Sequence, residues 1–173
     1  DIGADPQSIR AAALDDAGML WEVDADGARS LGQADGAVAV DVGTSGLVVL
    51  AGDDGLQTRR GNQVLQRFAL PVEQVLDVAL SVDERWAAVG GLDGRTVVIG
   101  VDDGEVVAIL EGHQERVSTL VWTADAMLYS GSWDGTVRAW NLSVVDGGVQ
   151  RALLDAEERW GLTADAAMAT LAP

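Results

Sequence analysis

The chain contains neither cysteine nor lysine, and it has a single histidine, a single phenylalanine and a single tyrosine. Without cysteine there can be no disulfide framework and no thiolate metal site. One histidine leaves only oxygen ligands for a metal, so the sequence predicts no metal site and no cofactor. No apolar run approaches the roughly 18 residues that a membrane-spanning helix needs, and no membrane association is expected.

Basic residues are also scarce. All eleven are arginine, against 28 acidic residues, and the formal net charge is −17 at pH 7. Such a charge repels phosphate backbones, so nucleic acid is not an expected partner. Two interpretations of the charge remain open, a solvated acidic surface from a GC-rich or salt-adapted bacterium and a surface for a basic partner. No signal-like segment appears, and the expected location is the cytoplasm.

Apolar residues make up 48% of the 173 residues, which is enough for one domain with a real core. Many of the 21 glycines lie beside aspartate or asparagine, where tight turns need positive φ. Representative β-prone segments are 47–51, 96–101, 117–123 and 136–140. Turn signals at 24–27, 61–62, 102–104 and 146–148 each indicate a hairpin between the third and fourth strands of a repeat.

Four aspartates mark an internal repeat. Asp15, Asp54, Asp93 and Asp134 each close an apolar run, at intervals of 39, 39 and 41 residues, and the last three are followed directly by glycine. The segment TADAAMAT at 163–170 repeats TADAMLYS at 123–130 with a shift of 40 residues. A period near 40 that fills the chain indicates a repeat protein built from one supersecondary unit.

The best-preserved copy is LEGHQERVSTLVWTADAMLYSGSWDGTVRAWN at 110–141, with a Gly-His pair, a Ser-Trp-Asp-Gly turn and a closing Trp-Asn. This segment resembles a blade of the WD-repeat (WD40-type) β-propeller family, and a bacterial member is expected. The resemblance implies an all-β fold, a β-propeller of about four four-stranded blades that is part of a larger or intermolecularly closed ring. The blade copies are expected at roughly 8–31, 32–70, 71–110 and 111–154, with a partial copy at 155–173, so that the first copy begins partway through a blade.

In that family a His, a Ser or Thr, an Asp and a Trp form a buried structural hydrogen-bond chain, and the resemblance assigns these roles to His113, Ser130, Asp134 and Trp140. The other copies keep only the turn Asp. The third has Pro71, Val89 and Ile99 at the other positions, and the second has Gln33, Leu50 and Arg60. Those copies are therefore expected to rely on apolar packing between sheets.

Ser130, His113 and Asp134 are also the residue types of a hydrolase triad, which is a remote alternative function. The sequence around Ser130 is Tyr-Ser-Gly-Ser, with no Gly-x-Ser-x-Gly elbow, and the family role already accounts for all three side chains. We expect no catalytic residues and no enzyme activity.

A partner-binding rim is predicted beside this network. The resemblance places Trp133 on the propeller's top surface, and strand alternation turns Arg116 and Ser118 toward the same rim. The equivalent residues of the third copy are Gln74, Leu76 and Leu92. The alternatives are that Trp133 covers the neighbouring blade and that Arg116 forms an exposed salt link with Glu115 or with another glutamate.

The expected function is a non-catalytic scaffold or sensor platform that binds a protein partner, or another part of the same polypeptide, on this rim. The alternative is a structural self-assembly module that pairs blades between chains. Four blades are too few for the usual ring, and open ends would expose strand edges and apolar faces. Three completions are considered, namely a longer protein of which this is an excerpt, a homo-oligomeric ring, and a four-bladed closure, and the excerpt is favoured.

Overall fold

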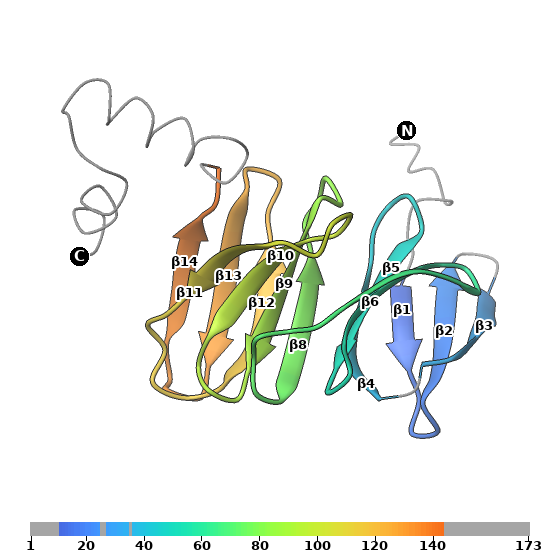
Figure 1. Cartoon of the computed structure of the whole chain (residues 1–173), viewed down its shortest axis with the longest axis horizontal. Coiled ribbons are helices and arrows are strands. Elements are labelled where there is room, and N and C mark those ends of the chain that lie inside the picture. Colours follow the sequence, from blue (N-terminus) through green and yellow to red (C-terminus); the bar gives the residue numbers. More distant parts are fainter. Residues whose placement is uncertain (1–10, 25–26, 35, 144–173) are drawn as a thin grey trace, which may run out of the picture. The chain divides into compact units, whose positions relative to one another are not determined.

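A computed structural model describes residues 11–24, 27–34 and 36–143, and in these residues it contains fourteen strands and no helix (Figure 1). The chain divides into two compact units, Asp1–Trp140 and Asn141–Pro173. Apart from the last residue of the final strand, all of the described strands belong to the first unit. No helix in the described part is long and apolar enough to cross a membrane.

The strands form four antiparallel sheets in which each strand pairs with its neighbours in the sequence. The first sheet contains β1 (Ala11–Leu14), β2 (Met19–Asp24) and β3 (Gly27–Gln33). The second contains β4 (Ala37–Val42), β5 (Leu47–Gly52), β6 (Gly55–Arg60) and β7 (Gln63–Phe68). The third contains β8 (Val75–Leu80), β9 (Trp86–Gly91), β10 (Thr96–Gly100) and β11 (Val106–Leu110). The fourth contains β12 (Val117–Trp122), β13 (Met127–Ser132) and β14 (Val137–Asn141).

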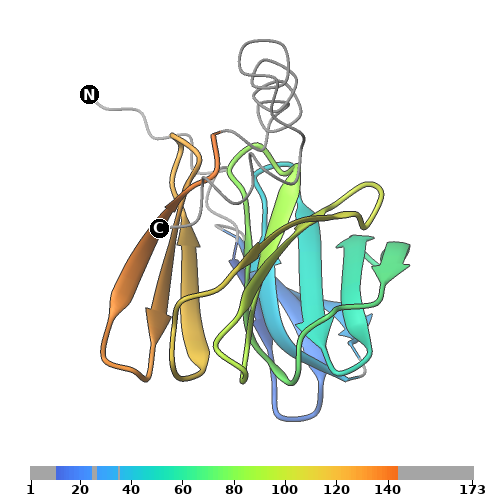
Figure 2. The ribbon, with the colours of Figure 1, turned by 60° about the vertical axis from the view of Figure 1, so that its left-hand side comes forward.

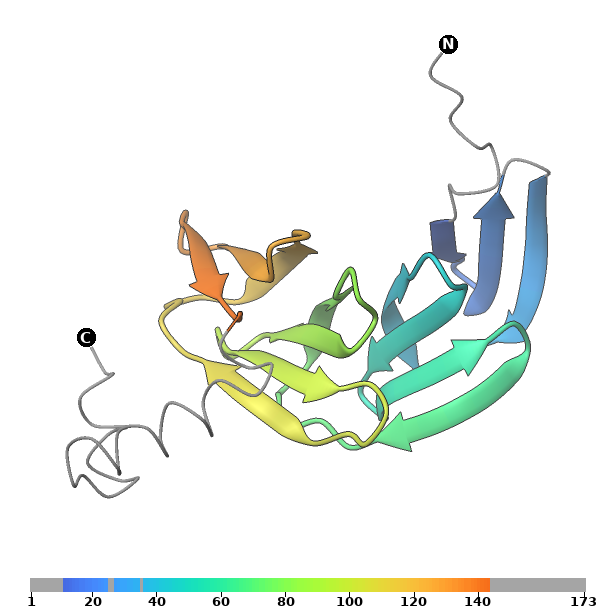
Figure 3. The same ribbon diagram turned by 90° about the horizontal axis from the view of Figure 1, so that it is seen from above.

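The predicted fold class is confirmed by this arrangement of four sheets of three or four strands. Figure 3 shows the first unit from above, with the sheets following one another in chain order. The strands predicted at 47–51, 96–101, 117–123 and 136–140 correspond to β5, β10, β12 and β14 within one residue at each end. The division into blade copies stays a prediction, and the partial copy at 155–173 lies outside the described residues.

The first sheet resembles the last three strands of a complete sheet. Its β2–β3 pairing shifts register between Leu20 and Trp21, and the β10–β11 pairing shifts between Val98 and Ile99. Both shifts fall five to six residues after the turn aspartate, which is Asp15 in the first sheet and Asp93 in the third. Among the described residues, the first sheet therefore lacks a counterpart of β8.

Two apolar clusters hold successive sheets together. One joins the first and second sheets and contains Leu20, Leu31, Ala34, Val48 and Leu50. The other joins the second and third sheets, and its large members include Leu47, Val49, Leu56, Val78, Val89 and Ile99. Every residue of β5 and β10 is buried, because these strands lie inside their sheets and are covered on both faces.

Polar bonds cross between the innermost strands of neighbouring sheets. Asp41 on β4 accepts a hydrogen bond from the backbone N–H of Leu80 at 2.8 Å. In the next interface Asp77 on β8 accepts the N–H of Leu120 at 2.7 Å, and the indole of Trp122 donates to the carbonyl of Ala79 at 3.1 Å. Burial raises the pKa of Asp77 above its ordinary value, although the Leu120 N–H opposes the shift.

Glu84, in the turn after β8, adds a further link between the second and third sheets. Its carboxylate accepts the backbone N–H of Ser45 at 2.7 Å and the hydroxyl of Thr44 at 3.2 Å. Glu84 has a φ of 60°, a left-handed conformation that costs free energy in a non-glycine residue. A Cβ on Gly43 would lie 2.4 Å from this carboxylate, so only glycine leaves room for the contact.

The second copy packs against its neighbours through apolar residues, as the sequence predicts, and a buried arginine adds polar bonds that the sequence does not predict. Arg59, beside the Arg60 that the sequence pattern singled out, is buried on β6 and reaches back to the first sheet. Its guanidinium donates to the carbonyls of Gln33 at 3.0 Å and Leu31 at 3.1 Å. Its Nε finds no partner among the described residues, and burial lowers the pKa of the Arg59 guanidinium. The second sheet thus replaces the His-Ser-Trp chain with an arginine that ties it to β3.

Candidate functional site

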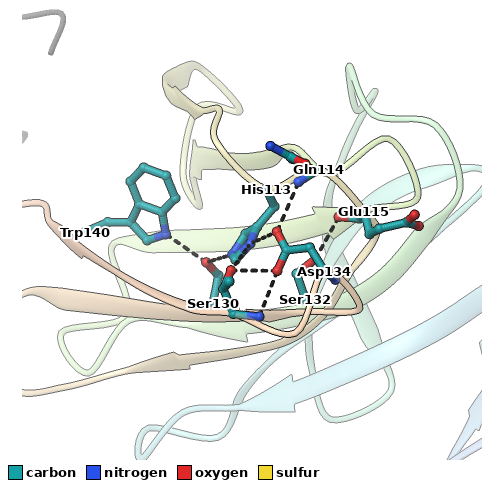
Figure 4. Close-up of polar contacts among 8 residues, drawn as sticks. His113, Gln114, Glu115, Ser130, Ser132, Asp134 and Trp140 are labelled. Atoms are coloured by element: carbon teal, nitrogen blue, oxygen red, sulfur yellow. Dashed lines mark hydrogen bonds and ion pairs between the residues drawn. The ribbon is translucent and has the colours of Figure 1, made fainter.

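The four residues assigned to the hydrogen-bond chain meet in the fourth sheet (Figure 4). Ser130 lies on β13, Trp140 on β14 and Asp134 in the turn between them, while His113 comes from the loop before β12. The His113 ring bonds through Nδ1 to Asp134 at 2.9 Å and through Nε2 to Ser130 Oγ at 2.8 Å. The Trp140 indole donates to the same Oγ at 2.8 Å.

The hydrogen bonds among these four residues all point the same way, from Trp140 through Ser130 and His113 to Asp134. The indole N–H of Trp140 can only donate, so the Ser130 oxygen accepts this hydrogen bond. The Ser130 hydroxyl in turn donates a hydrogen bond to Nε2 of His113. This leaves Nδ1 as the protonated nitrogen, which donates to the Asp134 carboxylate. The geometry therefore assigns the neutral Nδ1–H tautomer, with every buried polar atom of the chain satisfied.

Asp134 is the acceptor at the end of the chain and also pins the turn. It accepts the Thr136 hydroxyl at 2.6 Å and N–H at 2.8 Å, and the N–H of Gln114 at 3.0 Å. The bond from the Thr136 side chain is the largest of several that hold the pKa of Asp134 well below its ordinary value of 3.8. The carboxylate stays ionised at neutral pH.

The distances alone would satisfy a Ser-His-Asp triad, since the serine, the imidazole and the carboxylate are in the right order. Burial favours the structural role. Ser130 has no exposed surface, its oxygen is engaged by Trp140 as well as His113, and His113 is also buried. The hydroxyl is therefore shielded and already bonded on both sides, as a structural network requires.

The other turn aspartates make fewer bonds. Asp93 accepts the N–H of Arg95 at 3.1 Å, and Asp54 has no hydrogen bond with any described residue. Asp15 accepts the indole N–H of Trp21 directly at 2.9 Å, and this bond is the main reason that the pKa of Asp15 is lowered. Asp15–Trp21 and Asp134–Trp140 share a spacing of six residues, but only the first pair bonds directly, whereas Ser130 and His113 link the second.

Trp133 and Arg116 form a stacked pair at the predicted rim. The Trp133 side chain is 65% exposed, and its backbone N–H donates to the carbonyl of Arg116 at 3.1 Å. The guanidinium carbon of Arg116 lies 3.4 Å from the centroid of the Trp133 ring. Arg116 has no ion pair with a described acidic residue, so the expected alternative of a salt link to Glu115 is not seen.

The third sheet carries an equivalent pair. The N–H of Leu92 donates to the carbonyls of Glu73 and Gln74, as the N–H of Trp133 does to that of Arg116. Leu92 and Gln74 are exposed, and Gln74 has a φ of 44°. A Cβ on Gly94 would lie 3.0 Å from the carbonyl oxygen of Glu115, so the third-sheet turn touches the loop that bears Arg116.

The remaining two rim candidates differ in exposure. Ser118 is exposed on β12, whereas Leu76 is half-buried on β8. The assignment of the six rim residues to partner binding stays a prediction. No group of three or more potential metal ligands occurs among the described residues.

Comparisons with known proteins agree with the fold. Residues 104–141 match the family model described as WD domain, G-beta repeat. The pre-rRNA-processing protein IPI3 of Mycosarcoma maydis is 32% identical over 83 residues, 47% of this chain and 14% of that protein. THO complex subunit 6 of Drosophila melanogaster is 29% identical over 92 residues, 51% of this chain and 26% of that protein. A ribosome biogenesis protein WDR12 homolog of Arabidopsis thaliana is 45% identical over 40 residues, 23% of this chain and 9% of that protein.

Solved structures show the same architecture. The computationally designed Ika4 protein superposes with a TM-score of 0.61 at 23% identity, over 76% of this chain and 84% of that chain. A chain of the mitotic checkpoint complex superposes with a TM-score of 0.55 at 22% identity, over 64% of this chain and 37% of that chain. At these identities the likeness concerns the fold alone.

Taken with the four sheets, these matches confirm a propeller-like all-β fold, and the match of residues 104–141 supports the WD-repeat family. The chain spans only 9% to 26% of the length of the three relatives described. All three are eukaryotic, so a bacterial source is not supported.

Proposed function

We propose that this WD-repeat chain is a non-catalytic platform that binds a protein partner at the rim formed by the turns after β9 and β13. The observation that carries the proposal is the exposed Trp133 ring with Arg116 stacked on it. Trp and Arg are the residue types most enriched among interface hot spots. An indole that is 65% exposed has a large apolar area left uncovered in the described chain.

The neighbouring polar residues support a non-catalytic role. His113, Ser130 and Asp134 bond to one another and to Trp140, which leaves the exposed Trp133 and the half-buried Arg116 available to a partner. The relatives point the same way. One is named as a subunit of a complex, and a structural neighbour comes from an assembly. These names belong to those proteins, and they support a protein partner for this chain by analogy only.

A selection experiment tests the platform. A random peptide library displayed on phage is selected on the 173-residue chain and counter-selected on the Arg116→Gln/Trp133→Leu double variant. That variant gives the fourth sheet the residues that the third sheet carries as Gln74 and Leu92, so it should fold normally. We expect sequences that bind the original chain at least about tenfold better than the variant, since one lost hot spot costs this much or more. A library with no such sequences contradicts the proposal, provided that both proteins melt at the same temperature.

The second candidate function is self-assembly, and one observation favours it. The face of the fourth sheet that points away from the third exposes Tyr129 by 40% and Val137 by 72%. The equivalent residues of the third sheet, Ala88 and Thr96, are 0% and 1% exposed. A second copy of the chain could cover this face, and the molar mass in solution separates the two candidates.

A further inference from the structure

Building on the proposed function, we propose that the Arg116–Trp133 pair binds a carboxylate side chain of an acidic peptide that also carries an apolar residue. The pair offers two complementary surfaces. The stacked guanidinium presents N–H donors at its edge, and the indole presents apolar area beside them. Apart from their contact with each other, neither side chain has a hydrogen bond, ion pair or ring contact with another described residue.

The guanidinium is held in place but its hydrogen-bond donors are free. Arg116 makes no hydrogen bond or ion pair through its side chain with any described residue, and only the ring contact with Trp133 fixes it. Stacking uses the face of the guanidinium and leaves the fork of donors in its plane. An arginine restrained in this way loses less rotamer freedom on binding than a free surface arginine would.

The donor fork decides the chemistry of the ligand. Two parallel N–H groups match the two oxygens of a carboxylate, giving charge-assisted bonds that are stronger than neutral ones. A cationic ligand is disfavoured, because Arg116 already covers a face of the Trp133 ring and would repel a second cation there. The chain's net charge of −17 repels any anion, and a phosphate, with nearly twice the charge of a carboxylate, meets more of this repulsion. Screening at physiological salt weakens the repulsion for both, so the smaller charge of a single carboxylate is the more readily accepted.

Leu92 supplies the apolar neighbour. It is 41% exposed and occupies in the third sheet the place that Trp133 has in the fourth. Gly94, which shares a turn with Leu92, packs against the carbonyls of His113 and Glu115. A peptide whose acidic residue reaches Arg116 can therefore place a neighbouring apolar side chain against the rings and methyl groups of this rim.

Four labelled peptides test the proposal by fluorescence anisotropy with the 173-residue chain. Each has a Gly/Ser background and a central leucine–X–phenylalanine, in which X is glutamate, glutamine, lysine or phosphoserine. We expect the glutamate peptide to bind about tenfold tighter than the glutamine peptide and the lysine peptide to bind more weakly than both. Arg116→Gln should abolish this preference, and Arg116→Lys should lose most of it because lysine lacks the fork. Arg138→Gln is the matched control, an exposed arginine on β14 that should leave the preference unchanged.

Each contrary outcome overturns the inference. These are equal binding of the glutamate and glutamine peptides, tighter binding of the lysine or phosphoserine peptide, no binding of any peptide, or a preference that survives Arg116→Gln. The platform itself is judged separately by the phage selection. A selection that enriches neutral or basic sequences dependent on Trp133 preserves the proposed function while this inference fails.

Discussion

His113 is the residue on which the fourth sheet's polar interior depends. Removing its ring by His113→Ala leaves the Ser130 hydroxyl without its acceptor and Asp134 without one of its donors. We expect this to lower the free energy of unfolding by about 1 to 3 kcal/mol, the usual penalty for orphaned buried polar groups. Denaturant unfolding at neutral pH measures the change. A midpoint identical to that of the original chain would show that the network contributes nothing.

The low pKa of Asp134 predicts how stability responds to acid. A carboxyl whose pKa is depressed in the folded state contributes stability above its unfolded pKa, near 3.8, and loses it as the pH falls toward the folded value. Asp134→Asn should therefore be less stable than the original chain at pH 6, and the difference should shrink below about pH 4. Thermal melts of both proteins from pH 7 to pH 3 test this. A difference that stays constant over that range would contradict the assignment.

At this scale the sequence predicted some contacts and missed others. The four members of the polar chain were identifiable because they sit at fixed positions of a repeat motif. The stacking of Arg116 on Trp133 depends on side-chain conformations that no spacing encodes. Arg59 was passed over in favour of its neighbour Arg60, since only the register between sheets shows which of two adjacent arginines points inward.

Arg59 links one element to another, from β6 to β3 across the boundary between the first two sheets. Arg59→Ala leaves the carbonyls of Leu31 and Gln33 without these donors. We expect amide hydrogen exchange in β3 to accelerate by at least about tenfold, while β9 and β10 change little. Arg60→Ala is the control, because Arg60 is exposed and its nearest polar partner is the hydroxyl of Ser45 at 3.4 Å. Equal exchange in the two variants would show that Arg59 does not anchor the first sheet.

Asp77 gives the interface between β8 and β12 an opposite response to pH. Its pKa is raised by burial, so the folded state prefers the protonated carboxyl, and stability falls as the pH rises from about 3.8 through the raised value. Asp77→Asn keeps an oxygen for the Leu120 N–H and removes the buried charge. We expect the variant to melt higher than the original chain at pH 7 and this advantage to diminish toward pH 3. A lower melting temperature at pH 7 would mean that the charge itself stabilises the interface.

The strands were predictable as elements, and the bonds between sheets were not. Alternating apolar residues and Asp-Gly turns place β5, β10, β12 and β14 because they are local features. For Asp41 and Asp77 the sequence holds a local signal of a bond between sheets, because each is a carboxylate flanked by aliphatic residues inside a strand. Glu84 carried none, since its contact with Ser45 joins residues 39 positions apart.

Within the part of the chain that the structure describes, the outer face of the fourth sheet is exposed at Tyr129 and Val137. The corresponding face of the third sheet is covered by the fourth sheet. The Trp122 indole of the fourth sheet donates to the carbonyl of Ala79, and a Cβ on Gly90 would lie 2.9 Å from Val117. The fourth sheet is shown from another side in Figure 2, with β14 as its last described strand. At its exposed positions Tyr129 is larger than the buried Ala88, and Val137 is more apolar than the buried Thr96, which gives the face a tendency to associate.

This face predicts self-association of the isolated chain. We expect light scattering to give a molar mass that rises with concentration over the micromolar range, because burying apolar area between copies is favourable. Tyr129→Lys should hold the mass at that of one chain and leave the melting temperature nearly unchanged, since the side chain lies on the exposed side of β13. Val82→Lys is the matched control, an exposed apolar residue away from this face that should not alter the mass. If the original chain stays monomeric at every concentration, or if Tyr129→Lys associates as strongly, copies of the chain do not pair through the fourth sheet and the self-assembly candidate is refuted.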